Sequence, residues 1–206
     1  MGRGDRPDAA ADAGRTVLMP SYELPPTTAL GMRRGYRIAR SIIHSHTPFS
    51  HDACDGDGQP DGVINEPCLQ DYRLGLCANR LDFVFNTDHE ELAARFPFEA
   101  LLLQRPGDEL ILEDGVPTAN RIACENGAQP ILLPGGEFEV MPVAMKRHVV
   151  GTIEEREAIY NAATVESVNL LRETGAVILQ AHGEQRTVEE LRPLGLDGFE
   201  IYNLHA

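Results

Sequence analysis

The stretch YRIARSIIHSHTPFSHD (36–52) decides how this chain is interpreted, because an apolar run leads directly into a cluster of three histidines. The run at 36–43 has the composition of a strand, and His44 and His46 follow it in an H-x-H pattern. Residues i and i+2 of a strand point to the same side, so both imidazoles can reach one cation. Imidazole nitrogen binds zinc, manganese and iron readily, and the pattern therefore predicts a transition-metal site.

Composition limits the class of protein. The 206 residues are enough for one sizeable domain with a hydrophobic core. The formal net charge of −14 argues against broad binding of nucleic acid or anionic membranes, since those partners need a cationic face. A small anionic substrate is compatible with this charge, because bound cations invert the local field. No segment approaches the roughly 18 consecutive apolar residues of a membrane span.

The chain is expected to consist of a lead-in and one domain. Residues 1–30 are rich in Ala, Asp, Gly and Pro and carry no apolar signal-peptide core, so a disordered lead-in is expected there. A leader upstream of Met1 is compatible with this interpretation if the chain is a piece of a longer one. Residues 31–206 then form the domain.

Apolar strands alternate with helices along the domain. Strand-like runs are expected at 36–43, 81–91, 131–140, 176–184 and 197–203, with a strand and a turn at 109–117. Helices are expected at 66–80 and 152–175, and shorter helical stretches at 90–104 and 188–195. This alternation is typical of a mainly parallel sheet, a fold that places its chemistry at the C-terminal ends of its strands.

Polar candidates stand where these strands end. They are His44 and His46, Asp88 and His89 in NTDHEE, Glu137 in GGEFEV, and His182 in LQAHGE. Asp88 is interpreted as a carboxylate that orients His89 or as a direct ligand, with a helix N-cap as the alternative. Glu137 is interpreted as a carboxylate able to bridge two metals, with an ordinary solvent-facing strand residue as the alternative.

Two further sets of residues complete the candidate site. His148 lies in KRHVVG, next to Lys146 and Arg147, and either His51 or Asp52 is expected to supply another ligand. The full set of candidate metal ligands is His44, His46, His51, Asp52, His89, Glu137, His148 and His182, with Asp88 and His182 as candidate catalytic residues. This set suits a centre of two or three cations that activates a water for attack on a phosphate ester.

Taken in their order along the chain, these motifs resemble those of the PHP (polymerase and histidinol phosphatase) family of metal-dependent phosphoesterases. IIHSHTPFSHD resembles its H-x-H-T opening, FVFNTDHEE its T-D-H motif, PGGEFEV its G-x-E segment, LQAHGE its A-H-P motif and GFEIYN its V-E-x-x-N element. KRHVVG falls where the family has a histidine-bearing strand, and the resemblance covers roughly residues 36–203.

The resemblance implies an α/β fold, a distorted (β/α)7 TIM-like barrel with a trinuclear site for Mn, Zn or Fe. It also implies that a small phosphorylated substrate is hydrolysed, with His44, His46, His89, Glu137, His148 and His182 as ligands. The family's last motif, Asp-x-His, is absent up to Ala206. The chain is therefore expected to lack the last strand or strands of that barrel.

The acidic segment 52–68 departs from the family pattern as an insertion. Asp55, Asp57 and Asp61 form a D-x-D-G-x-x-D pattern that resembles calcium-binding loops, with a solvated acidic turn as the alternative. Cys54 and Cys68 bracket the segment and would suit a disulfide that closes it, with free thiols as the alternative for all four cysteines. Calcium and disulfides together favour an extracytoplasmic, secreted location over the cytoplasm.

Two other functions stay open at this point. A metal-dependent amidohydrolase also opens with H-x-H on a barrel strand, but it normally needs a lysine at a strand end, and none stands there. A secreted calcium-binding or interaction module on a catalytically silent barrel would account for the acidic insertion and the absent last motif.

Overall fold

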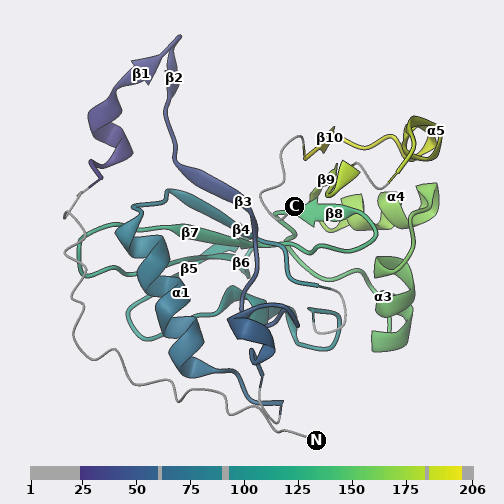
Figure 1. Cartoon of the computed structure of the whole chain (residues 1–206), viewed down its shortest axis with the longest axis horizontal. Coiled ribbons are helices and arrows are strands. Elements are labelled where there is room, and N and C mark those ends of the chain that lie inside the picture. Colours follow the sequence, from purple (N-terminus) through teal and green to yellow (C-terminus); the bar gives the residue numbers. More distant parts are fainter. Residues whose placement is uncertain (1–23, 60–61, 90–92, 184–185, 201–206) are drawn as a thin grey trace, which may run out of the picture.

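The structure, a computed structural model, describes residues 24–59, 62–89, 93–183 and 186–200 (Figure 1). The strands are β1 (Met32–Arg33), β2 (Tyr36–Arg37), β3 (Ser41–Ser45), β4 (Phe83–Asn86), β5 (Glu109–Glu113), β6 (Val116–Arg121), β7 (Ile131–Pro134), β8 (Met141–Val143), β9 (Val177–Gln180) and β10 (Gly198–Phe199). The α-helices are α1 (Glu66–Ala78), α3 (Ile153–Tyr160), α4 (Val165–Glu173) and α5 (Val188–Leu191). The 3-10 helices are η1 (Thr27–Leu30), η2 (Cys54–Gly56), η4 (Phe98–Leu102) and η6 (Arg192–Leu194).

Three sheets organise the described residues. The largest has the strand order β3-β4-β7-β6-β5, in which β3, β4 and β7 run parallel and the β5–β6 hairpin is antiparallel. The second has the order β10-β9-β8, with β9 parallel to β10 and antiparallel to β8. The third is the small β1–β2 hairpin, which extends away from the other two sheets (Figure 1).

The predicted TIM-like barrel is wrong. Among the described residues, no sheet closes on itself, and the sheets are separate. The five-stranded sheet ends in the β5–β6 hairpin, because the chain at 109–121 turns back at Asp114 and Gly115, both with positive φ, instead of crossing over through a helix. β8 pairs with β9 and not with β7, so the parallel series stops after three strands. The fold is a mixed α/β arrangement of small sheets.

The helix predicted at 152–175 is two helices. Thr152 caps α3 in the expected capping box with Glu155, but α3 ends at Tyr160. Thr164 then caps α4 in a second box with Ser167, whose hydroxyl also donates to the carbonyl of Ala162. Because Ser and Thr side chains bond readily to nearby backbone groups, Thr164 and Ser167 stabilise a new helix start there.

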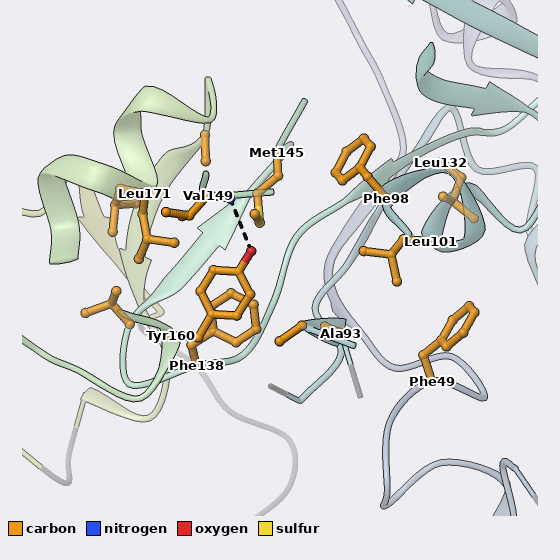
Figure 2. Close-up of a cluster of buried hydrophobic side chains, with 14 of the residues drawn as sticks. Phe49, Ala93, Phe98, Leu101, Leu132, Phe138, Met145, Val149, Tyr160 and Leu171 are labelled. Carbon is orange, nitrogen blue, oxygen red and sulfur yellow. Dashed lines mark hydrogen bonds between the residues drawn. The ribbon is translucent and has the colours of Figure 1, made fainter. Parts of the chain in front are cut away.

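One continuous hydrophobic core joins the two larger sheets. Leu132 of β7 and Ile178 of β9 belong to the same cluster of buried side chains, although their strands lie in different sheets. In the same cluster, the rings of Phe138 and Tyr160 stack with centroids 4.2 Å apart, and Met145 also belongs to it (Figure 2). The core therefore fixes the two sheets relative to each other, which matters because the candidate site draws residues from both.

All four cysteines form disulfides. Cys54 is bonded to Cys68, which closes the acidic insertion, and Cys77 at the end of α1 is bonded to Cys124 beyond β6. Disulfides are typical of oxidising compartments. Within the described part of the chain, no helix has the length and apolar character needed to cross a membrane.

The expected lead-in is only partly covered by the structure. Residues 1–23 lie outside the described residues. Thr27 begins the 3-10 helix η1, is buried, and donates a hydrogen bond from its hydroxyl to Asp82 at 2.9 Å.

Candidate metal centre

The two histidines of the H-x-H pattern lie on the same side of β3, as predicted. His44 is in the strand and His46 follows its last residue, and their Nε2 atoms are 3.1 Å apart. Strand β3 is the edge of the five-stranded sheet, and its C-terminal end lies beside the C-terminal end of the parallel strand β4. The alternation of side chains along the strand therefore aims both rings at one point.

Glu137 reaches the same point because the chain bends sharply after β7. A Cβ on Gly135 would lie 2.5 Å from the carbonyl oxygen of Pro142, so only glycine fits this close approach. The backbone N–H of Glu137 donates to the carbonyl of Asp88 at 3.0 Å, and an isolated bridge pairs Glu137 with His89. The side chain of Glu137 is consequently buried, and the alternative of a solvent-facing strand residue is wrong for it.

The Glu137 carboxylate lies between two groups of histidines. Its Oε1 is 2.5 Å from Nε2 of His182, and its Oε2 is 3.0 Å from Nε2 of both His44 and His46. Nε2 of His89 lies 3.5 Å from the same Oε2. These residues form two sets of three potential metal ligands. In each set the three ligand atoms lie within 4.8 Å of one another; the sets are His44, Glu137 and His182, and His46, His89 and Glu137.

His182 reaches Glu137 from the second sheet. It follows β9 and has a positive φ of 50°, a conformation that is uncommon for residues other than glycine, although histidine adopts it more often than most. Its backbone N–H donates to Glu200 Oε2 at 3.3 Å. Such rare backbone conformations occur preferentially at functional sites.

A carboxylate occupies the far side of each histidine of the H-x-H pattern. Both oxygens of Asp52 lie within 2.9 Å of His46 Nδ1, and Glu200 Oε1 lies 3.0 Å from His44 Nδ1. A carboxylate on Nδ1 fixes the ring orientation and leaves Nε2 as the ligand atom, which is the common arrangement around protein-bound metals. The donor set thus fits a divalent transition metal, with imidazole nitrogens and one shared carboxylate.

Glu200 was missed by the sequence reasoning. It follows β10 directly, so the rule that selected the other candidates, a polar residue at a strand end, applies to it as well. The sequence pattern places Glu200 inside the strand expected at 197–203, whereas β10 ends at Phe199, so Glu200 stands at a strand end only in the structure.

Carboxylates and histidines shift each other's pKa values in the cluster. Burial of Glu137 would raise the pKa of its carboxyl group, but the hydrogen bonds from His44 and His46 hold that pKa well below its usual range. Burial lowers the pKa of His46, yet its contacts with Glu137 and Asp52 outweigh this and raise it to about 9. The bond to Glu137 likewise raises the pKa of His44. The carboxylates therefore favour positive charge at this position, whether on a proton or a metal.

Asp88 and His51 lie beside the cluster and are absent from both three-residue sets. Asp88 is buried and accepts hydrogen bonds from the backbone N–H of Thr47 at 2.6 Å and from its hydroxyl at 2.8 Å. Burial raises the pKa of Asp88 to about 6. Asp88 thus holds the loop after β3, since both of its carboxylate oxygens bond to Thr47. His51 stacks on His89, with ring centroids 4.4 Å apart, whereas the neighbouring Asp52 faces His46.

The structure does not bring His148 to the cluster. Its Nε2 donates to the carbonyl of Phe96 at 2.9 Å, and its Nδ1 therefore accepts from the hydroxyl of Tyr160 at 2.9 Å. Both ring nitrogens are used, and burial lowers the pKa of this histidine. His148 is thus a buried residue bonded within the protein, and among the described residues it belongs to neither set of potential ligands.

The predicted calcium loop gains no support. Asp61 lies outside the described residues, and Asp55 and Asp57 are exposed. Neither belongs to a group of potential ligands among the residues that the structure describes.

A hollow of about 420 Å³ opens beside the candidate centre. His44 and His46 line it together with Tyr72 and the Cys54–Cys68 disulfide. Beneath it, the Tyr72 hydroxyl donates to Asn86 at 2.6 Å and lies 3.1 Å from the Ser45 hydroxyl. A small molecule therefore has room to reach the histidines from this side.

Comparison of the chain with models of protein families, with curated proteins and with solved structures gives no match.

Proposed function

We propose that the protein is a metal-dependent phosphoesterase whose centre holds two divalent cations that share Glu137. The observation that carries this proposal is that the Glu137 carboxylate belongs to both sets of three ligand atoms. Its Oε1 lies 2.5 Å from Nε2 of His182, and its Oε2 lies 3.0–3.5 Å from Nε2 of His44, His46 and His89. A carboxylate shared in this way is a common ligand between two metals about 3.5–4 Å apart. The order of the motifs, which resembles that of the PHP family, supports the same function.

The residues of such a site would have two roles, binding the ions and orienting the histidine rings. His44, His46, His89 and His182 would hold the ions with Glu137, while Asp52 and Glu200 keep two of the rings in register. Bound there, Zn, Mn or Fe would lower the pKa of a water toward neutrality and neutralise the charge of a phosphate. The hollow beside His44 and His46 would accept the remainder of a small phosphorylated substrate.

The disulfides extend the proposal to the cell compartment. Two of them within the described residues favour an extracytoplasmic, secreted protein, because cytosolic reductants keep thiols reduced.

The test combines metal content with hydrolysis of 4-nitrophenyl phosphate and of bis(4-nitrophenyl) phosphate. We expect about two transition-metal ions per chain after reconstitution, and a loss of activity of at least about 100-fold in Glu137→Gln. Glu139→Gln is the matched control, since it removes a carboxylate two positions away that is exposed and pairs with Arg186.

The proposal fails if reconstituted protein binds no transition metal, or if Glu137→Gln and Glu139→Gln hydrolyse both esters at the wild-type rate. Metal binding without hydrolysis of either ester would retain the metal centre and reject the phosphoesterase.

A further inference from the structure

A second hollow, of about 860 Å³, lies at the opposite end of the parallel strands from the candidate metal centre. Ile38 precedes β3, Phe83 begins β4 and Ile131 begins β7, and all three line it, whereas the histidines stand where the strands end. At ~3.3 Å per residue, the two sites are roughly 10–15 Å apart along the strands. The volume is in the range of pockets that bind small molecules.

The walls of this second hollow are cationic in a strongly acidic chain. Arg37, Arg80 and Arg121 line it, although the chain has a net charge of −14 and only 18 lysines and arginines. Within the described residues, the side chains of Arg37 and Arg80 form no ion pair, and Arg121 pairs only with the exposed Glu109. Exposed pairs of this kind are weak, so the three guanidinium groups are available to an anion.

One carboxylate lies in the wall, and the protein already uses both of its oxygens. Asp82 accepts from the hydroxyl of Thr27 at 2.9 Å and from the backbone N–H of Arg40 at 2.7 Å. Arg40 in turn donates from its guanidinium group to the carbonyls of Arg80 and Pro25. These hydrogen bonds connect the residues before β4, the residues after α1 and the N-terminal segment. They hold this wall of the hollow in a fixed arrangement.

Much of the remaining lining is apolar. Leu81 and Ile131 are half-buried, and Ile38, Phe83 and Met32 are exposed. Pockets that combine apolar walls with a few convergent charges bind ligands that have both parts. We propose that this hollow binds a small organic anion, a carboxylate, sulfonate or phosphate carried on a flat apolar body.

The proposal is tested with 8-anilinonaphthalene-1-sulfonate as the probe, titrated into the full chain and followed by fluorescence. We expect saturable binding that weakens about five- to tenfold in Arg37→Gln and in Arg80→Asn, because each loses a charged hydrogen-bond donor to the anion. Asn is chosen at position 80 because the backbone there has a positive φ of 48°.

Arg33→Gln is the matched control, since it removes the same charge from the β1–β2 hairpin but not from the hollow. It should bind the probe within about twofold of wild type. The uncharged analogue N-phenyl-1-naphthylamine should bind at least about fivefold more weakly than the sulfonate. Absence of saturable binding, equal affinity for the two probes, or equal losses in Arg33→Gln and Arg37→Gln would each overturn the proposal.

Discussion

Nδ1 of His44 lies 3.0 Å from Oε1 of Glu200, a residue 156 positions away that directly follows β10 of the three-stranded sheet. This contact fixes the ring so that Nε2 faces Glu137. We expect Glu200→Gln to weaken zinc binding by roughly 10- to 100-fold, the usual effect of losing a carboxylate behind a metal-binding histidine. Titration against a competing chelator measures the change. Glu189→Gln, an exposed carboxylate at the start of α5, should bind zinc like the wild type, and equal affinities in both variants would contradict the prediction.

Gly135 should tolerate no side chain. A Cβ there would lie 2.5 Å from the Pro142 carbonyl oxygen and 2.9 Å from that of Asn86, both backbone atoms that cannot move independently. We expect Gly135→Ala to lower the free energy of unfolding by about 2–4 kcal/mol, as measured in urea. Gly75→Ala is the control, because Gly75 lies inside α1 with open space around it, and should stabilise the protein by about 0.5–1 kcal/mol. A neutral Gly135→Ala would contradict the described bend.

His148 should make stability depend on pH. Burial lowers its pKa below the ordinary value of 6.5, so below pH 6.5 the unfolded chain binds a proton that the folded protein rejects. The stability contributed by His148 is therefore present above pH 6.5 and is lost as the pH falls. We expect His148→Gln to cost about 1–3 kcal/mol at pH 8, through its two lost hydrogen bonds, and less at pH 5.5. Urea unfolding at both values measures this, and a cost that does not change with pH would refute it.

The two disulfides should contribute unequally. The Cys77–Cys124 bond spans 47 positions and the Cys54–Cys68 bond spans 14, so loop closure in the unfolded chain gives about 4 and about 3 kcal/mol respectively. We expect the Cys77→Ala/Cys124→Ala variant to melt at a lower temperature than the Cys54→Ala/Cys68→Ala variant. Calorimetry at one scan rate compares them, and the reverse order would be inconsistent with this account.

The gathering of polar side chains at strand ends could be predicted from the sequence. His44, His46, His89, Glu137 and His182 come together because each follows an apolar run that becomes, or lies beside, a strand. That signal is local, since it needs only a polar residue directly after a short apolar run. His148 shows its limit, because a histidine in an apolar context is equally suited to a core position with both nitrogens bonded.

The arrangement of the strands was not predictable in the same way. The sequence pattern predicts a strand and a turn at 109–117 but not the returning strand β6, which completes the hairpin through Asp114 and Gly115. Whether β8 pairs with β7 or with β9 depends on long-range contacts, which hydrophobic patterning does not encode. The Cys54–Cys68 disulfide agrees with the pairing suggested by the two cysteines that bracket the acidic segment, whereas the pairing of Cys77 with Cys124, 47 positions apart, has no such local signal.

The two sets of ligands have a thermodynamic consequence. His44 belongs to the five-stranded sheet and His182 follows a strand of the three-stranded sheet, so an ion held by both with Glu137 would cross-link the sheets. Since the unfolded chain does not present these ligands together, such an ion would act as a clamp on the folded form. At a free concentration of 100 times its Kd, it would add about 2.7 kcal/mol to the unfolding free energy.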